Sequence, residues 1–178
     1  MAGGFGVGKT TLVGSVSEIA PLTTEAVLTD ASTVVDDLAA TPDKSTTTVA
    51  MDFGRVSLDA ELILYLFGTP GQSRFWFMWD ELARGAVGAV VLVDLRRVDD
   101  CFPAIDYFED HRIPFLVAVN NFEGMERFEL DEVREALGVV ARVPVLDCDA
   151  RSRDSVKDVL VALTEEVLSR RLEHAATR

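Results

Sequence analysis

The apolar positions of the chain follow two different patterns. Short runs rich in Val, Leu and Ala have the length of buried strands, and the segments between them carry apolar residues at helical spacing. Buried strands are predicted at 62–67, 86–94, 115–119 and 143–146. Helices are predicted at 99–110 and 131–137, followed by a last helix whose apolar stripe is Val156, Val159, Leu160, Leu163 and Val167.

Buried strands that alternate with helices are typical of an α/β protein, in which helices cover both faces of a mostly parallel sheet in three layers. Segment 48–58 is predicted to pair antiparallel with 62–67 through a turn at 59–61, which adds one antiparallel edge strand. Residues 21–47 are polar and too long for an ordinary connection, so we expect them to be functional or mobile. The length of 178 residues predicts one domain over residues 1–178.

The residues from 3 to 10 read Gly-Gly-Phe-Gly-Val-Gly-Lys-Thr and match the pattern of a phosphate-binding loop. Glycines let consecutive backbone N–H groups turn inward around a β-phosphate, and the helix that follows adds the positive end of its dipole. Lys9 is predicted to neutralise the β- and γ-phosphates, and the Thr10 hydroxyl to bind Mg²⁺. The alternative is an ordinary glycine-rich turn before a helix. The predicted phosphate-binding residues of this loop are Gly3, Gly4, Phe5, Gly6, Val7, Gly8, Lys9, Thr10 and Thr11.

A buried strand normally precedes such a loop in the middle of the sheet, but only Met1 and Ala2 stand before Gly3. We therefore expect this strand to be missing, through a start placed too late in the gene or a shortened chain. Its loss would leave two neighbouring strands with unpaired backbone groups, which destabilises a sheet.

Three further motifs follow predicted strands. Gly68-Thr69-Pro70-Gly71-Gln72 follows the first, and in such a loop a glycine N–H senses a γ-phosphate while a glutamine orients water. Asn120-Asn121-Phe122-Glu123 follows the third strand, and Cys148-Asp149-Ala150-Arg151 follows the fourth.

Together with the phosphate loop, these motifs stand in the order seen in Ras-like small GTPases, and the chain resembles this family of P-loop NTPases over nearly its whole length. It is most similar to bacterial members encoded in actinobacterial conservon operons, and more distantly to gliding-motility polarity GTPases of the MglA type. The closer similarity rests on Gly-Gly-Phe-Gly at 3–6, Thr-Val-Ala-Met-Asp-Phe-Gly at 48–54 and Phe-Gly-Thr-Pro-Gly-Gln at 67–72.

The resemblance implies roles for individual residues. Thr48 becomes the switch threonine that reaches Mg²⁺ and the γ-phosphate, with Thr46 and Thr47 as alternatives. The implied catalytic residues are Lys9, Thr48 and Gln72, the implied metal ligands are Thr10 and Thr48, and Gly71 joins the phosphate-binding residues. The implied base-binding residues are Asn120, Glu123, Asp149, Ala150 and Arg151. Among them, Asn120 takes the guanine N7 side, Glu123 pairs with N1–H and N2–H₂, and the Ala150 N–H meets O6.

Several positions depart from the family pattern. Gly68 stands where an aspartate commonly holds the water shell of magnesium; Asp52 is a candidate replacement, although a solvated strand carboxylate is the favoured interpretation. Phe5 fills a position that is small in fast GTPases, Asn121 replaces a lysine, and Glu123 replaces an aspartate.

The segment that follows Gln72 offers a candidate arginine and an aromatic run. Arg74 is a candidate internal arginine finger, although a partner contact is favoured. The run 75–79, Phe-Trp-Phe-Met-Trp, is predicted to be partly core and partly partner surface.

Composition excludes several classes of partner. A net charge of −13 and a pI near 4.5 argue against nucleic acid or anionic lipid as the main partner. The longest apolar stretch, 86–93, is too short to cross a bilayer, so no membrane insertion is expected. Cys101 and Cys148 lack metal-ligand spacing and are interpreted as reduced thiols of a cytoplasmic protein.

The predicted function is a switch that binds GTP with Mg²⁺ and hydrolyses it slowly to GDP. By resemblance, its partners are a Roadblock/LC7-type regulator and a sensor kinase. Two alternatives remain open. A non-hydrolysing nucleotide-binding scaffold is favoured by Gly68 and Phe5. An ATPase or small-molecule kinase is disfavoured by Asn120 and the 148–151 loop, and would bind ATP as well as GTP.

Overall fold

The computed structural model describes residues 1–20, 22–23 and 51–176. The expectations for the rest of 21–47, and for Thr46 to Thr48, lie outside these residues. The strands are β1 (Leu22–Thr23), β2 (Asp52–Ser57), β3 (Ile63–Phe67), β4 (Ala89–Val93), β5 (Phe115–Asn120) and β6 (Val145–Cys148). The helices are α1 (Lys9–Val16), α2 (Trp79–Ala83), α3 (Phe102–Asp110), α4 (Leu130–Leu137) and α5 (Arg153–Ala176), with the 3₁₀ helices η3 (Ser73–Met78) and η4 (Leu95–Cys101).

The described strands form two sheets of three. β4, β5 and β6 are parallel and adjacent in that order, and β1, β2 and β3 are antiparallel. The predicted antiparallel pair of β2 and β3 is confirmed, and its turn is fixed by the Asp59 carboxylate, which accepts hydrogen bonds from the N–H groups of Glu61 and Leu62. The strand β1 was not expected from the sequence, and its pairing with β2 makes a second antiparallel contact.

Met1 and Ala2 join the two sheets. The Ala2 N–H donates to the Val90 carbonyl at 2.8 Å, and the Leu92 N–H donates to the Ala2 carbonyl at 2.9 Å, which makes a parallel bridge to β4. On the other side, the Met1 nitrogen donates to the Phe67 carbonyl at the end of β3, at 2.6 Å. Two residues therefore lie where the sequence analysis expected the strand before the phosphate loop, and they are paired on both sides.

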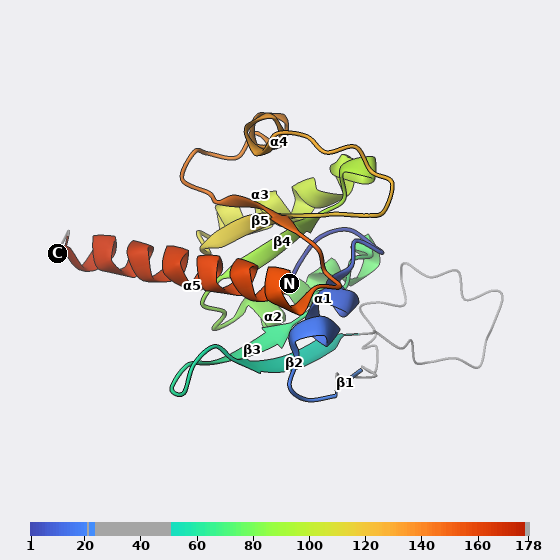
Figure 1. Cartoon of the computed structure of the whole chain (residues 1–178). Helices are drawn as coiled ribbons and strands as arrows, with labels where there is room; N and C mark the ends of the chain where they lie inside the picture. Colours follow the sequence, from blue (N-terminus) through green and yellow to red (C-terminus); the bar gives the residue numbers. More distant parts are fainter. Residues whose placement is uncertain (21, 24–50, 177–178) are drawn as a thin grey trace.

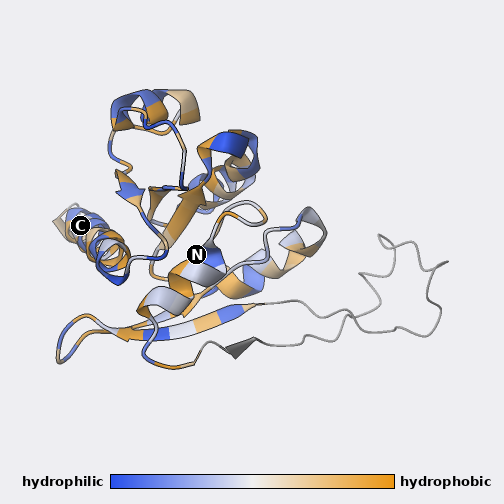
Figure 2. Ribbon diagram, turned by 45° about the vertical axis from the view of Figure 1, so that its right-hand side comes forward, coloured by the Kyte–Doolittle hydropathy of each residue, from blue (hydrophilic) through white to orange (hydrophobic). Residues whose placement is uncertain are grey.

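Helices cover both faces of the parallel sheet, as the three-layer prediction required (Figure 1). Along β4, Val90 and Leu92 pack against α1 and α5, whereas Val91 and Val93 face the side of α3 and α4. This alternation follows from the two-residue period of a strand. Figure 2 shows the result, with mostly orange strands between helices that mix orange and blue residues.

Local sequence sets several helix boundaries. Pro103 lies in the first turn of α3, where the missing N–H of proline costs nothing, and the predicted helix at 99–110 therefore begins as the 3₁₀ segment η4. α4 ends at Gly138, whose positive φ of 65° suits a helix C-cap. The apolar stripe predicted for α5 is buried along its whole length. In the described part of the chain, no helix is long and apolar enough to span a membrane.

Candidate nucleotide-binding site

The phosphate loop leaves the bridge at Ala2 and curls over the carboxyl ends of the parallel strands. Gly3, Gly6 and Gly8 have φ of 130°, 73° and 108°, values that side chains rarely allow, so the loop can be built only with glycine there. Within the described residues, no backbone N–H from Phe5 to Thr11 donates a hydrogen bond. A row of free donors that ends at the N-terminus of α1 is the arrangement that binds phosphate.

Lys9 lies beneath this loop and is buried. Its Nζ donates to the Gly3 carbonyl at 2.9 Å and to the Gly4 carbonyl at 2.7 Å. Burial lowers the pKa of Lys9 to about 8, although the Asp52 carboxylate partly opposes this shift. Lys9 therefore stays mostly charged at neutral pH and loses its proton at mildly alkaline pH, and a phosphate beside Nζ would raise the pKa again.

The Gly68–Gln72 loop closes directly on Lys9. A Cβ built on Gly71 would lie 2.8 Å from both Lys9 Nζ and the Phe5 nitrogen, so only glycine fits there. The Trp79 indole holds the same loop by donating to the Pro70 carbonyl at 3.3 Å. The Gly71 backbone therefore lies close to the Lys9 ammonium and to the phosphate loop at Phe5.

The position of Asp52 contradicts the interpretation favoured from the sequence, which was a solvated strand carboxylate. Its side chain is not solvated: the residue is only 9 % exposed and accepts a hydrogen bond from the Thr10 hydroxyl at 2.8 Å. A Cβ on Gly68 would lie 2.9 Å from Asp52 Oδ2, so the carboxylate occupies the space that a side chain at Gly68 would fill. A carboxylate from the adjacent strand therefore lies beside Gly68 and the Thr10 hydroxyl.

Asn120 connects the phosphate loop to the loop after β6. Its amide Nδ2 donates to the Val7 carbonyl at 2.9 Å, and its Oδ1 accepts from the Ala150 N–H at 3.0 Å. The side chain is buried, and a Cβ on Gly8 would lie 2.7 Å from Nδ2. The Ala150 N–H, which the resemblance assigns to guanine O6, is thus engaged with Asn120 in this structure.

The other predicted base-binding side chains lie nearer the surface. Arg151 donates to both carboxylate oxygens of Asp149, and this pairing lowers the pKa of Asp149. Glu123 is exposed, in the loop after β5. Cys148 is buried and free, and burial raises its pKa to about 11, which keeps it a thiol at neutral pH.

The remaining predicted residues are Gln72, Arg74 and Thr48, together with the aromatic run. Gln72 is half-buried at the start of η3, and the side chain of Arg74 lies outside the described part of the chain, as does Thr48. In the aromatic run, Phe75 and Trp79 are buried, whereas Trp76 and Phe77 are 40 % and 56 % exposed.

Sequence reasoning missed a group of residues after β4. Asp94 is buried, and its carboxylate accepts two hydrogen bonds from the Arg96 guanidinium, which stacks 3.8 Å from the centre of the Phe122 ring. Arg97 donates to the Phe5 carbonyl in the phosphate loop. The signal was an Asp-Leu-Arg-Arg run directly after a buried strand, in a chain with few cations.

This fold and loop define a P-loop nucleotide-binding protein that resembles a G domain. The chain belongs to the family described as conserved hypothetical ATP binding protein, whose model matches residues 1–170. A comparison with curated proteins gives no significant match. The family and fold thus support P-loop NTPase membership, but not the narrower conservon resemblance.

Solved structures with this fold include domains of the iron transporter FeoB. The G domain of T. maritima FeoB has a TM-score of 0.61 and 16 % identity, with 94 % of each chain covered. The FeoB G-domain of Methanococcus jannaschii has a TM-score of 0.60 and 15 % identity, with 93 % of this chain and 94 % of that one covered. The cytosolic domain of T. maritima FeoB, in a GDP form, has a TM-score of 0.65 and 16 % identity. The match covers 93 % of this chain and 61 % of that domain.

The buried Lys9 predicts that nucleotide affinity falls at alkaline pH. In the free protein, a pKa of about 8 leaves the lysine mostly neutral at pH 9, and binding must then add a proton. Affinity for GTP at saturating Mg²⁺ should be about tenfold weaker at pH 9 than at pH 7. Calorimetry at pH 8.5 in two buffers of different ionisation heat should show proton uptake. Equal affinities at pH 7 and pH 9 would contradict the burial of a titrating lysine.

Proposed function

We propose that this chain is a GTP-binding switch that hydrolyses GTP slowly with Mg²⁺, as one domain over residues 1–178. The observation that carries the proposal is the double hydrogen bond of Asn120, to Val7 in the phosphate loop and to Ala150 in the loop after β6. One buried side chain thereby fixes a phosphate cradle at a set distance from a second loop, as recognition of a whole nucleotide requires.

Guanine is the proposed base. Glu123 follows Asn120 at the spacing at which an acidic residue pairs with the N1–H and N2–H₂ donors of guanine, and its exposure leaves it accessible to a ligand. Adenine offers no matching donors and would leave that carboxylate unpaired. The family description names ATP, so the choice of base is the first property to measure.

Magnesium is the proposed cofactor, and the residues present fit it. The Thr10 hydroxyl is a hard oxygen donor at the start of α1, and Asp52 supplies a buried carboxylate beside it. The described residues contain no cluster of three or more His, Cys, Asp or Glu side chains, so the ion would depend on phosphate oxygens and water for its other ligands. Bound there, it would neutralise charge on the β- and γ-phosphates; Thr48 is proposed to complete its ligands.

Gly71 is the proposed nucleotide sensor. Its backbone lies close enough to Lys9 and the Phe5 nitrogen that an added Cβ would collide with both, so we propose that a terminal phosphate bound between these groups would displace Gly71. The loop continues through Gln72 into η3, which carries the exposed Trp76 and Phe77. Binding of the γ-phosphate would therefore shift an apolar surface, and that surface is where we place the contact with a Roadblock/LC7-type regulator or a sensor kinase.

Hydrolysis is proposed to use positioning more than acid–base chemistry. Gln72 would orient the attacking water beside the γ-phosphate, while Lys9 and the free N–H groups of the loop hold the charge that develops. The side chain of Phe5 is 63 % exposed over the loop, where it would obstruct an arginine from a partner. Slow intrinsic turnover is proposed because Phe5 would also crowd the γ-phosphate and Gly68 cannot itself anchor the water shell of magnesium.

A second candidate function is a nucleotide-binding scaffold without turnover. The closeness of the Gly71 backbone to Lys9 favours it, because it leaves little room beside Lys9 for a γ-phosphate. Such a protein would retain a nucleoside diphosphate and would leave GTP unhydrolysed.

Base selectivity should depend on Glu123. The GTP-to-ATP affinity ratio should fall by roughly tenfold or more in Glu123→Ala, because a carboxylate that accepts two guanine donors is lost. Glu126→Ala, which removes a nearby exposed carboxylate, serves as the matched control. Chromatography of nucleotide released from the denatured parent protein should show guanine nucleotide. Adenine nucleotide there, or a parent ratio near one, would overturn the choice of base.

The Mg²⁺ requirement for GTP binding should change when Asp52 is replaced. The Mg²⁺ concentration for half-maximal GTP binding should rise by about 10–100-fold in Asp52→Ala, the range found when outer-shell partners of a metal are removed. Asp52→Asn retains an acceptor for the Thr10 hydroxyl and separates loss of charge from loss of the hydrogen bond. Circular dichroism checks that both variants fold. An unchanged Mg²⁺ requirement in both would show that the carboxylate has no part in the metal site.

Turnover should depend on Gln72. In single-turnover assays with saturating Mg²⁺, GTP hydrolysis in Gln72→Ala should be at least about tenfold slower than in the parent, with GTP affinity little changed. Ser73→Ala alters the exposed neighbour and should hydrolyse GTP at the parent rate. Equal rates in parent and Gln72→Ala would exclude water positioning by this side chain. A parent that binds GTP without cleaving it would instead support the scaffold.

A further inference from the structure

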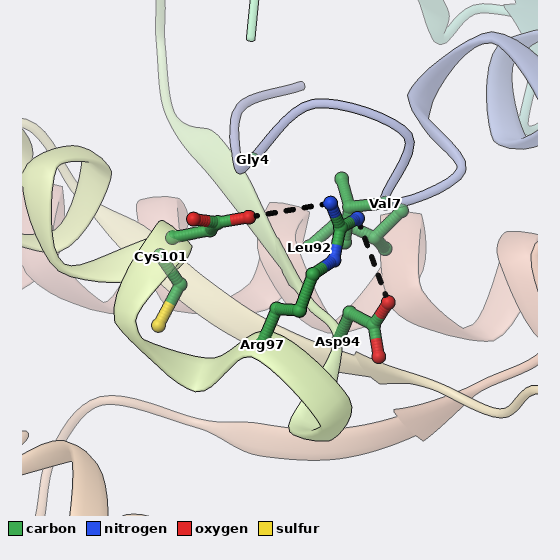
Figure 3. A pocket seen from close by; sticks show the side chains of 7 residues that line it. Gly4, Val7, Leu92, Asp94, Arg97 and Cys101 are labelled. Atoms are coloured by element: carbon green, nitrogen blue, oxygen red, sulfur yellow. Dashed lines mark ion pairs between the residues drawn. The ribbon is translucent and has the colours of Figure 1, made fainter.

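We propose that Arg97 is a positioning residue of the phosphate loop: its guanidinium holds the Phe5–Gly6 peptide so that the Gly6 N–H faces the phosphates. The inference rests on the proposed nucleotide site. Arg97 Nη2 donates to the Phe5 carbonyl at 2.7 Å and lies 3.6 Å from the position of a Cβ on Gly6. Figure 3 shows this side chain as it extends from η4 toward the loop.

The geometry of the Phe5–Gly6 peptide bond links the direction of the Phe5 carbonyl to the direction of the Gly6 N–H. The described chain has no cis peptide, and in a trans peptide the C=O and the following N–H point in opposite directions. A Phe5 carbonyl that points out toward Arg97 therefore directs the Gly6 N–H into the loop. Gly6 has a φ of 73°, in the left-handed region that lets successive N–H groups converge on an anion.

A charged donor on this carbonyl also strengthens the site. Hydrogen bonds from a guanidinium are stronger than those between neutral groups, and a peptide polarised at its oxygen becomes a better donor at its N–H. Arg97 would thus add positive charge to the phosphate cradle through the backbone, without a contact to the nucleotide itself.

The surroundings of Arg97 favour the loop carbonyl over an ordinary ion pair. Arg97 Nη2 lies 3.8 Å from Asp94 Oδ2, and Arg97 Nη1 lies 3.6 Å from Asp100 Oδ2. Both oxygens of the Asp94 carboxylate already accept hydrogen bonds from Arg96. The Arg97 guanidinium is about half exposed and Asp94 is already paired with Arg96, so these two long ion pairs contribute little. The backbone of Arg97 departs from helical geometry, with φ −144° and ψ 58°, and this kink lies where the side chain turns to the loop.

Packing fixes the position of η4 against the loop. A Cβ on Gly4 would lie 2.5 Å from the Asp100 Cβ, so the turn and the loop touch at Gly4 without an intervening side chain. The same turn carries Cys101 into the core. Arg97 is therefore held beside Phe5 by the fold.

The test compares Arg97→Ala, Arg97→Lys and the parent, with Arg84→Ala as a control that removes an equal charge from an exposed helix end. Two probes are titrated with Mg²⁺ by calorimetry: GTP, and inorganic pyrophosphate, which has phosphates but no base. The Gly6 amide resonance is recorded by NMR in the nucleotide-free proteins, and thermal melting confirms folding.

Arg97→Ala should weaken binding of both probes by a similar factor of about ten, because the change affects the phosphate cradle alone. Arg97→Lys, which retains a charged donor, should recover part of that loss, and Arg84→Ala should match the parent. The Gly6 resonance should shift in Arg97→Ala and not in Arg84→Ala.

A loss confined to GTP, or a Gly6 resonance that is the same in Arg97→Ala and the parent, would overturn the positioning role. If the parent binds neither probe, the proposed function fails. The Gly6 resonance still decides whether Arg97 fixes the loop peptide.

Discussion

Backbone pairing of Met1 and Ala2 is the interaction on which the rest of the structure depends. Ala2 bonds to β4 on one side, and Met1 bonds to the end of β3 on the other, so two residues connect an antiparallel sheet to a parallel one. The phosphate loop begins at the next residue. Its direction, and its distance from Asp52 on β2 and Asn120 on β5, are therefore set by a few hydrogen bonds that each contribute about 1 kcal/mol. The site thus lies where the two sheets meet at Met1 and Ala2.

That arrangement explains how the site brings charge together within an acidic chain. Lys9 and Asp52 are both buried, and the lysine reaches loop carbonyls while the carboxylate accepts from Thr10. Burial of charge is costly unless partners are supplied, and each of these groups has polar partners within hydrogen-bond distance. The net charge of −13 thus says little about this pocket, where a lysine and a row of N–H groups face a single aspartate.

The sequence predicts the parts of the molecule that depend on local patterns of residues. The strands, the α5 stripe and the phosphate loop follow from periodicity and from one continuous motif, and the fold prediction is confirmed by the described strands and by the FeoB domains. The base-binding and catalytic residues stay predictions, because geometry alone does not test them.

Asp52 was misjudged because its role depends on pairing between strands. Only the register of β2 with β3, in which Phe53 faces Phe67 and the Gly68 N–H donates to the Asp52 carbonyl, places that carboxylate beside Gly68. The sequence shows only that position 68 has no carboxylate, whereas the structure places the Asp52 carboxylate beside it. Arg97 was missed for a similar reason, since the kink in η4 and the close contact at Gly4 arise from tertiary packing.

Asp94 shows how the two loops of the site are held by a single strand end. The strand β4 delivers this buried carboxylate beneath the site, and Arg96 neutralises it while its guanidinium stacks on Phe122 in the loop after β5. Because Arg96 satisfies Asp94, Arg97 can give its best hydrogen bond to the Phe5 carbonyl. The consecutive residues Arg96 and Arg97 thus contact different loops, because Arg96 is the one that pairs with the buried Asp94. η4 therefore contacts both the phosphate loop and the loop after β5. These contacts are separate from the hydrogen bonds of Asn120, which join the phosphate loop to the loop after β6.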